Sequence, residues 1–388
     1  MIAKMSQFIH LLSVCDSRND AKKIFLDLLA EYAWLIGASK RKMNQIYSFE
    51  TPETPYVEFG LTSGFEAKRA PWVQNRIDSS INDTMQFIAY QLQSTPEFDF
   101  VPSIGFGPGD SGLVARLFGS KTELLEDGAL LVRKYAATTL EELSHLDQPD
   151  IEANAEVREM VDDVERISSF FDRCIEITYP ALQGPITNLV RILPQEETLM
   201  SICTDPEVIK TMSTRIADVT ISILRKMHRI AGGSECFRPR GRFWQPPEIK
   251  GLFVDDYVSV IRPSNYLEVC SEGWEHMAQQ IGPLFLHTCG PTLQAAEAFK
   301  KLPGLRGFET AYVNKQHKTT LDIQEMKRLL GGKVVFCSFG LPFGNAVEDG
   351  ENLTADWLRQ TSCGGGFALQ ASGTPEDAAL FAQKLGLA

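Results

Sequence analysis

Two side chains that suit a zinc ion stand two residues apart in the stretch PLFLHTCGP. His287 and Cys289 follow the apolar run 283–286, and Gly290 and Pro291 then break the chain. Side-chain direction in a strand repeats every two residues, so the imidazole and the thiol would point to the same side. Zinc accepts such nitrogen and sulfur ligands, but two ligands do not complete a site. A buried histidine beside a small apolar cysteine explains the pair equally well.

The segments around this pair alternate between short apolar runs and amphipathic stretches. Apolar runs closed by turn residues predict strands at 176–182, 251–254, 283–288, 305–309, 333–337 and 366–370. Helices are predicted at 157–167, 205–229, 265–280, 292–299, 320–330, 352–360 and 375–385. Such alternation specifies parallel βαβ units, in which ligands bind at the C-terminal ends of the strands. With one or two earlier units they would form an eight-stranded (β/α)8 TIM barrel. A doubly wound open sheet is the alternative.

The first part of the chain, residues 1–90, is predicted to be a mostly helical extension packed on a barrel domain at 91–388. Apolar residues spaced by three and four predict a helix at 20–36, and a second helix is predicted at 78–94. Prolines interrupt any periodicity between these helices, where only 56–61 is a possible strand.

A glycine-rich loop follows a short strand predicted at 98–104. This loop, residues 105–112, has the sequence GFGPGDSG. It lacks the lysine and hydroxyl of a P-loop, and its glycines do not match a dinucleotide fingerprint. We therefore expect it to form the rim of a pocket rather than a phosphate site.

Composition limits the class of protein. The chain of 388 residues is 44% hydrophobic and 23% charged, which is typical of a globular protein. Its net charge of −12 argues against nucleic-acid or anionic-membrane partners. No apolar run is long enough to span a membrane, and the N-terminus has no convincing cleavage site. Eight scattered cysteines suit a reducing compartment, so we expect a cytoplasmic protein.

Several stretches together resemble the uroporphyrinogen decarboxylase superfamily, and most of all its corrinoid-linked methyltransferase branch. They are HTCG at 287–290, QGPIT at 183–187, DPE at 205–207, the strand end at Asp255 and Asp256, and GGGFALQASG at 364–373. The resemblance covers about residues 95–388 and is strongest after residue 176. It implies a (β/α)8 barrel with its active site at the C-terminal ends of the strands.

The resemblance also implies cofactors and partners. Zinc would be held by His287, Cys289 and a further cysteine near the end of the last strand. A methyl group would pass between a small methylated substrate, a methyl ether or a methylated amine, and a corrinoid protein. Because the chain has no D-x-H-x-x-G cobalamin motif, the corrinoid would come from a separate partner protein.

The third zinc ligand departs from this pattern, since Ala371, Ser372 and Gly373 stand where the cysteine is expected. Cys363 precedes the last strand and should lie at the opposite end of the barrel. Cys337 and Glu309 each end a strand, so either side chain could reach the end of the barrel at which His287 lies. The sequence does not choose between them.

Other side chains are expected at the same end of the barrel. Asp255, Asp256 and Asn188 are catalytic candidates, since either aspartate could orient His287 or handle a substrate proton. Solvent-exposed carboxylates at a strand end are the plain alternative. Less specific candidates for substrate or partner contacts are Arg262, the arginines 238, 240 and 242, and the aromatic residues Phe237, Phe243, Trp244, Phe339 and Phe343.

Two other functions compete with zinc-dependent methyl transfer. A metal-free decarboxylase of the same superfamily is one, although residues 1–75 hold no counterpart of its substrate-binding arginine motif. A barrel that has lost catalysis and keeps only partner binding is the other, and the missing third cysteine supports it.

Overall fold

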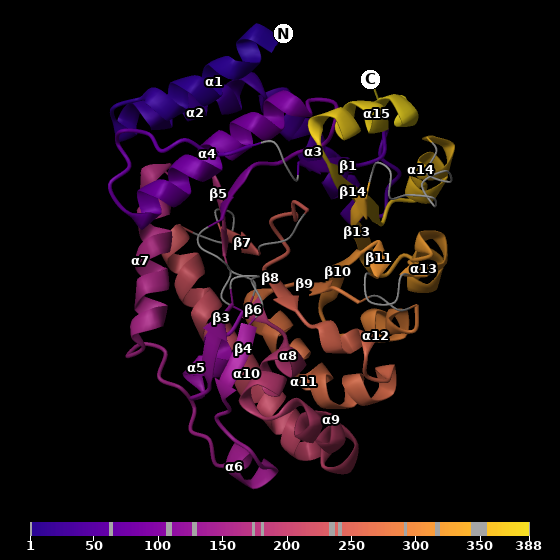
Figure 1. Ribbon diagram of the computed structural model, residues 1–388. Helices are drawn as coiled ribbons and strands as arrows, with labels where there is room; N and C mark the ends of the chain where they lie inside the picture. Colours follow the sequence, from indigo (N-terminus) through magenta and orange to yellow (C-terminus); the bar gives the residue numbers. More distant parts are fainter. Residues whose placement is uncertain are drawn as a thin grey trace.

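A computed structural model describes most of the chain and places strands inside a layer of helices (Figure 1). The described residues are 2–61, 65–105, 111–125, 130–172, 175–179, 182–232, 237–239, 243–290, 293–314, 319–342 and 355–387. Most of the glycine-rich loop at 105–112, together with Arg240, Arg242 and Phe343, lies outside these ranges.

The central element is a seven-stranded sheet in which every neighbouring pair is parallel. Its strands, in spatial order, are β1 (Val57–Leu61), β14 (Phe367–Gly373), β13 (Val335–Pro342), β10 (Leu305–Ala311), β9 (Leu284–Thr288), β8 (Gly251–Val254) and β6 (Leu182–Gln183). A second parallel sheet contains β2 (Ser103–Gly105), β5 (Glu176–Tyr179) and β7 (Phe237–Pro239). Two hairpins complete the described strands, β3 (Lys121–Leu124) with β4 (Leu130–Lys134) and β11 (Val313–Asn314) with β12 (Thr319–Thr320).

The helices lie outside the strands in Figure 1. Those before β5 are α1 (Ile2–Val14), α2 (Arg18–Glu31), α3 (Ala33–Tyr47), α4 (Arg76–Ser94), α5 (Leu113–Leu117), α6 (Leu140–Ser144) and α7 (Ala155–Phe170). Those after β5 are α8 (Pro185–Ile192), α9 (Gln195–Thr204), α10 (Pro206–Ala231), the 3-10 turn η1 (Asp256–Ser259), α11 (Pro263–Ile281), α12 (Ala295–Lys301), α13 (Ile323–Leu330), α14 (Ala355–Ser362) and α15 (Pro375–Leu385).

The α/β architecture predicted from the alternating pattern is confirmed. Strand and helix follow each other from β8 to α15, and β8 and α15 have the predicted bounds. The two parallel sheets adjoin where β5 passes to β6, and again where the backbone N–H of Asp99, just before β2, donates to the Val57 carbonyl at 2.8 Å. The described strands thus form two adjoining parallel sheets, and the closed eight-stranded barrel stays a prediction.

The segment expected as an extension contributes a strand to the central sheet. β1 pairs with β14 over five residues, from Val57 opposite Leu369 to Leu61 opposite Gly373. The possible strand at 56–61 is therefore confirmed. The first 90 residues thus contribute a strand to the central sheet as well as helices. The division into domains at residue 90 stays a prediction.

The two faces of the sheet bury different sets of side chains. Outward-facing strand residues such as Phe59, Leu286 and Phe308 belong to the large core shared with the helices. Inward-facing residues form a second buried cluster, in which Phe285, Val335, Cys337 and Ala368 pack with Tyr56, Phe243, Trp244 and the α3 residues Met43, Ile46 and Tyr47. The alternation follows from the two-residue period of a strand.

Helix α3 covers the N-terminal ends of the inner strands. The Arg306 guanidinium at the start of β10 donates to the Tyr47 carbonyl, and the backbone N–H of Gly366, just before β14, donates to the Ile46 carbonyl. The end of the sheet at which the strands begin is thereby closed, which leaves the C-terminal ends for a ligand site.

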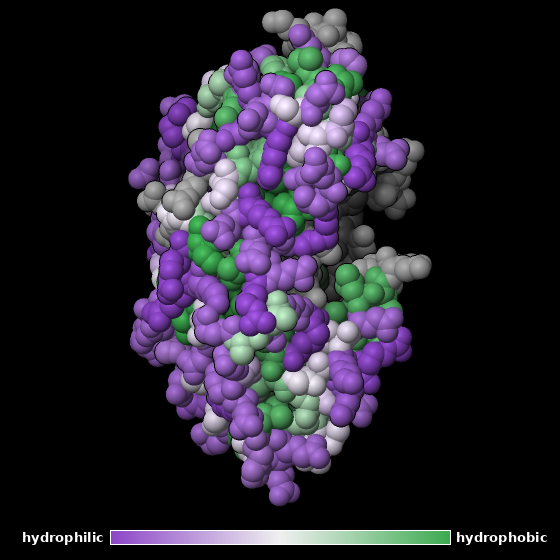
Figure 2. Space-filling model, turned by 90° about the vertical axis from the view of Figure 1, so that its left-hand side faces the viewer, coloured by the Kyte–Doolittle hydropathy of each residue, from purple (hydrophilic) through white to green (hydrophobic). Residues whose placement is uncertain are grey.

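The face drawn in Figure 2 is mostly hydrophilic, with its hydrophobic residues in small separate groups. Among the described residues, no helix is long and apolar enough to cross a membrane.

Packing of α3 against the sheet predicts opposite effects for two glycine substitutions. A Cβ atom on Gly307 would lie 2.8 Å from the Tyr47 hydroxyl and 2.9 Å from the Phe285 ring. We expect Gly307→Ala to lower the free energy of unfolding by about 1–3 kcal/mol through overpacking. Gly37 lies inside α3, and a Cβ atom there would have only the end of the Arg41 side chain within 4 Å. Gly37→Ala should therefore raise the free energy of unfolding by about 0.5–1 kcal/mol. Urea unfolding of both variants measures the two changes, and equal effects would contradict this packing.

Candidate metal centre

Strand register brings several predicted site residues to one level of the sheet. His287 on β9 is paired with Val254 on β8 and with Glu309 on β10, and Glu309 is paired with Cys337 on β13. Paired residues of neighbouring parallel strands point to the same face. The His287 ring also stacks on the Phe339 ring, with 5.3 Å between ring centroids.

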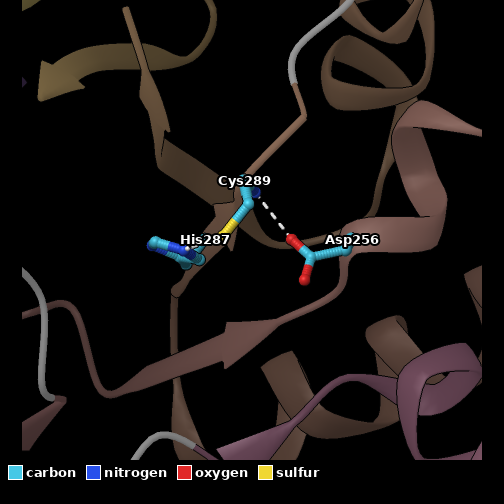
Figure 3. A group of neighbouring side chains, drawn as sticks. All are labelled: Asp256, His287 and Cys289. Carbon is cyan, nitrogen blue, oxygen red and sulfur yellow. Dashed lines mark hydrogen bonds between the residues drawn. The ribbon is translucent and has the colours of Figure 1, made fainter. Parts of the chain in front are cut away.

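Asp256, His287 and Cys289 offer three metal-ligand atoms that all lie within 4.8 Å of one another (Figure 3). His287 Nε2 lies 3.2 Å from Cys289 Sγ. The backbone N–H of Cys289 donates to Asp256 Oδ1 at 2.6 Å, which draws the start of η1 towards the end of β9. Neighbouring ligands of a tetrahedral zinc ion are about 3.5 Å apart, given its bond lengths to nitrogen, sulfur and oxygen. The three groups therefore fit a zinc ion with only small adjustments.

Glu309 lies at the other nitrogen of the same ring. Its Oε1 is 2.7 Å from His287 Nδ1, and its side chain is only 2% exposed. A carboxylate that accepts a hydrogen bond from Nδ1–H leaves the lone pair of Nε2 free for a metal ion and fixes the orientation of the ring. This placement favours an orienting role for Glu309 over the role of a third ligand.

Cys337 lies level with Glu309 but is fully buried in the inner cluster. Burial raises the pKa of this thiol well above its usual value, and the nearby charges of Glu309 and Glu58 raise it further. A zinc ligand must be a thiolate, so the surroundings of Cys337 disfavour the ligand role. Cys363 is exposed and its carbonyl accepts from the Lys327 ammonium, in agreement with its predicted place before the last strand.

The charge of His287 depends on opposing influences. Burial by itself would lower the pKa of His287, but hydrogen bonds to Cys289 and Glu309 and the charges of both groups raise it to about 10. Without a metal ion, the imidazole is therefore protonated on both nitrogens and positively charged at neutral pH. A metal ion would have to displace this proton, because only the neutral ring has a lone pair at Nε2.

Asp255 is completely buried and connects three elements. Its carboxylate accepts from the backbone N–H of Ile186 and the Thr187 hydroxyl at the start of α8, and from the Tyr266 hydroxyl in α11. A Cβ atom on Gly184 would lie 2.6 Å from Asp255, so glycine is needed there. Asp255 thus positions the ends of β6 and β8, and Asp256 is the aspartate that turns towards Cys289.

Asn188 is also completely buried, in α8. Its amide donates to the Gln183 carbonyl at 2.7 Å, and its Oδ1 finds no hydrogen-bond partner among the described residues. The structure therefore places Asn188 behind the end of β6, where it supports the backbone.

Three other predicted contact residues, all with described side chains, are not part of this group. Arg262 is exposed at the start of α11, and Phe243 and Trp244 are buried in the inner cluster with Tyr56. Phe339 does contact a member of the metal group, through its ring stacking on His287. The sequence analysis placed Asp256 among the catalytic candidates and not among the possible ligands, although its position two residues after β8 was a visible signal.

Comparison with known proteins supports the fold. No protein-family profile and no curated protein matches this sequence. Among solved structures, the chain resembles a methyltransferase from Methanosarcina mazei, with a TM-score of 0.59 and 12% sequence identity. The match covers 89% of this chain and 98% of that chain. At this identity the likeness shows a shared fold, and function has to be argued from the residues of the site.

Burial of Asp255 predicts a pH-dependent effect of Asp255→Asn. Burial raises the pKa of Asp255 from 3.8 to about 6, so the folded chain holds the proton more tightly than the unfolded chain does. Ionisation therefore lowers the stability of the native chain as the pH rises through this range, by about 3 kcal/mol in total. Asparagine does not ionise, so Asp255→Asn escapes this loss. As the pH rises, the free energy of unfolding of the variant should increase relative to that of the native chain by about that amount. Urea unfolding at about pH 4 and about pH 7 measures it, and a constant difference would contradict the argument.

Proposed function

We propose that the chain is a methyltransferase that binds zinc through Asp256, His287 and Cys289. The observation that carries the proposal is the convergence of three ligand atoms within 4.8 Å at the C-terminal ends of β8 and β9. Nitrogen, sulfur and oxygen donors from three side chains are typical of a catalytic zinc site, which keeps a fourth position open. In this proposal Asp256 takes the role of the cysteine that the resemblance leads one to expect near the end of the last strand.

The fold supports the same proposal. We infer that the two adjoining parallel sheets close into a (β/α)8 barrel of the uroporphyrinogen decarboxylase type. The solved structure that this chain resembles over 89% of its length is a methyltransferase. Ligand sites of such barrels lie at the C-terminal ends of the strands, where the three ligand atoms meet.

Each nearby side chain has a defined part in the proposed site. Zinc would supply Lewis acidity at its open position, to polarise the heteroatom of a methylated substrate or to lower the pKa of a bound thiol. Glu309 would accept a hydrogen bond from the Nδ1–H group of His287 and so keep Nε2 directed at the ion. Phe339 holds the flat face of the ring, and Asp255 anchors the strand end that carries Asp256.

The partner in the proposed reaction is a separate corrinoid protein. The resemblance suggests it, and a small methylated substrate would exchange its methyl group with that corrinoid. When the methyl group leaves the substrate, the bonding electron pair stays on the substrate's heteroatom. The acidic chain and its scattered cysteines agree with a cytoplasmic setting for such a reaction.

Zinc content is the first prediction of this proposal. The purified chain should hold close to one zinc per molecule, and His287→Ala, Cys289→Ala and Asp256→Asn should each lose it, because each removes one ligand. Glu309→Gln should keep zinc but bind it about 10–100-fold more weakly, as expected for a group that orients a ligand. Mass spectrometry of the metal and competition with a chelator measure both effects.

Cys337→Ala is the matched control, since Cys337 is a thiol at the same level of the sheet, two strands from His287. It should keep zinc with unchanged affinity. Loss of zinc in this variant, with retention in Asp256→Asn, would make Cys337 the third ligand and contradict the proposed set.

Methyl transfer is the second prediction. With methylated amines or methyl ethers and free reduced cobalamin, the native chain should convert Co(I) to methyl-Co(III), which absorbance spectroscopy follows. His287→Ala should reduce the rate to that without protein, because the substrate would no longer be polarised. A zinc-loaded native chain that transfers no methyl group from any of these compounds would leave a binding function instead.

A further inference from the structure

The proposed metal group joins side chains from two different strand ends. His287 lies in β9 and Cys289 directly follows this strand, whereas Asp256 is the first residue of η1, the 3-10 turn after β8 (Figure 3). The hydrogen bonds of a 3-10 turn are less well aligned than those of an α-helix, so a single turn holds its position poorly by itself. The distance from Asp256 to the other two side chains therefore depends on what fixes η1 to β9.

Two hydrogen bonds fix the start of the turn. The backbone N–H of Asp255 donates to the His287 carbonyl at 3.0 Å. The backbone N–H of Cys289 donates to Asp256 Oδ1 at 2.6 Å, and this bond uses the carboxylate that would also bind the ion. A movement of η1 would therefore displace a proposed ligand directly, unless the other end of the turn is fixed as well.

A pair of buried hydroxyls fixes that other end. Ser259 Oγ, on the last residue of η1, lies 3.1 Å from Thr288 Oγ1, and the two groups share a hydrogen bond. Thr288 is completely buried and Ser259 is 8% exposed, so water competes little for this bond. Thr288 stands between His287 and Cys289 in the chain. The bond thus joins the end of η1 to the residue between the two other proposed ligands.

The neighbouring strand carries a hydroxyl that has no such bond. Thr310 on β10 is paired with Thr288 and is also completely buried. Both threonines lie on the outer face of the sheet, because Leu286 and Phe308, two residues earlier, belong to the outer core. The Thr310 hydroxyl has no hydrogen-bond partner among the described residues, whereas that of Thr288 is bonded to η1. A comparison of these two positions isolates the effect of the bond to the turn.

We propose that the hydroxyl pair of Ser259 and Thr288 positions Asp256 for metal binding. This inference rests on the proposed zinc site and gives the two residues a role that needs no contact with the ion. They act through η1. While the hydroxyls are bonded, the turn lies against the end of β9 and the carboxylate stays beside the other two ligand atoms. Removal of either hydroxyl frees the end of the turn and lets the carboxylate move away.

Substitution by residues of similar shape tests the bond. Thr288→Val removes the hydroxyl and keeps the volume, so zinc should bind about tenfold more weakly than to the native chain, as expected for a group that orients a ligand. Thr310→Val makes the same change on the neighbouring strand and should leave the affinity unchanged. Thr288→Ser keeps the hydroxyl and should keep most of the affinity. Competition with a chelator measures all three, and equal affinities of Thr288→Val and Thr310→Val would overturn the inference.

Ser259→Ala tests the other half of the pair. If both hydroxyls act through their shared bond, Ser259→Ala should weaken zinc binding as much as Thr288→Val does. The double variant should then lose no more affinity than either single variant. Losses that simply add would show two independent effects and would overturn a role for the bond.

Hydrogen exchange of the zinc-free chain measures the position of Asp256 without a metal ion. The Cys289 amide donates to Asp256, so its exchange rate reports on the position of the carboxylate. In Thr288→Val this amide should exchange about tenfold faster than in the native chain, because the opened bond exposes it to water. Thr310→Val should leave the rate unchanged, and the amides in the middle of β9 should keep their rates in both variants. Faster exchange along the whole of β9 would indicate a general loss of stability and would overturn the positioning role.

The two measurements separate this inference from the proposed function. A chain that binds no zinc, but whose Cys289 amide exchanges faster in Thr288→Val, would support the positioning of Asp256 and reject the metal site. A chain that binds zinc equally well with and without the Thr288 hydroxyl would keep the proposed function and reject the role of the hydroxyl pair.

Discussion

The parallel register of β8, β9, β10 and β13 is the constraint on which the site depends. It sets Val254, His287, Glu309 and Cys337 level on one face, so that residues from four distant parts of the chain meet. A slip of one residue in a single strand would turn its side chain to the outer core. The outer face, rich in large apolar residues such as Phe308 and Leu286, makes such a slip costly. Packing on one side of the sheet thus secures the geometry on the other.

Buried charge is tolerated here because each group has an assigned partner. Glu309 faces the His287 ring, and Asp255 accepts three hydrogen bonds from α8 and α11. Removing one partner would leave the other charge buried and uncompensated, which costs far more than an exposed pair contributes.

Much of the fold could be predicted because its signals are local. Short apolar runs and turn residues locate β8 and α15, and a spacing of two locates His287 and Cys289. That β1 belongs to the central sheet was harder to predict, because its partner strand β14 lies at the other end of the chain. Closure of the two sheets into a barrel would likewise depend on contacts between distant segments, and no local pattern encodes such contacts.

The proposed third ligand shows where sequence reasoning stops. Asp255 and Asp256 are adjacent and chemically identical, so their order in the chain does not say which one faces the pair. Two tertiary facts decide it: β8 lies beside β9, and the start of α8 needs a buried acceptor that Asp255 supplies. Once Asp255 is committed to α8, the turn η1 leaves Asp256 directed at Cys289. A carboxylate is harder than the thiolate it would replace, and it donates less charge to the ion. An ion in the proposed site would therefore be the stronger Lewis acid, which suits the activation of a strongly basic and hence poor leaving group.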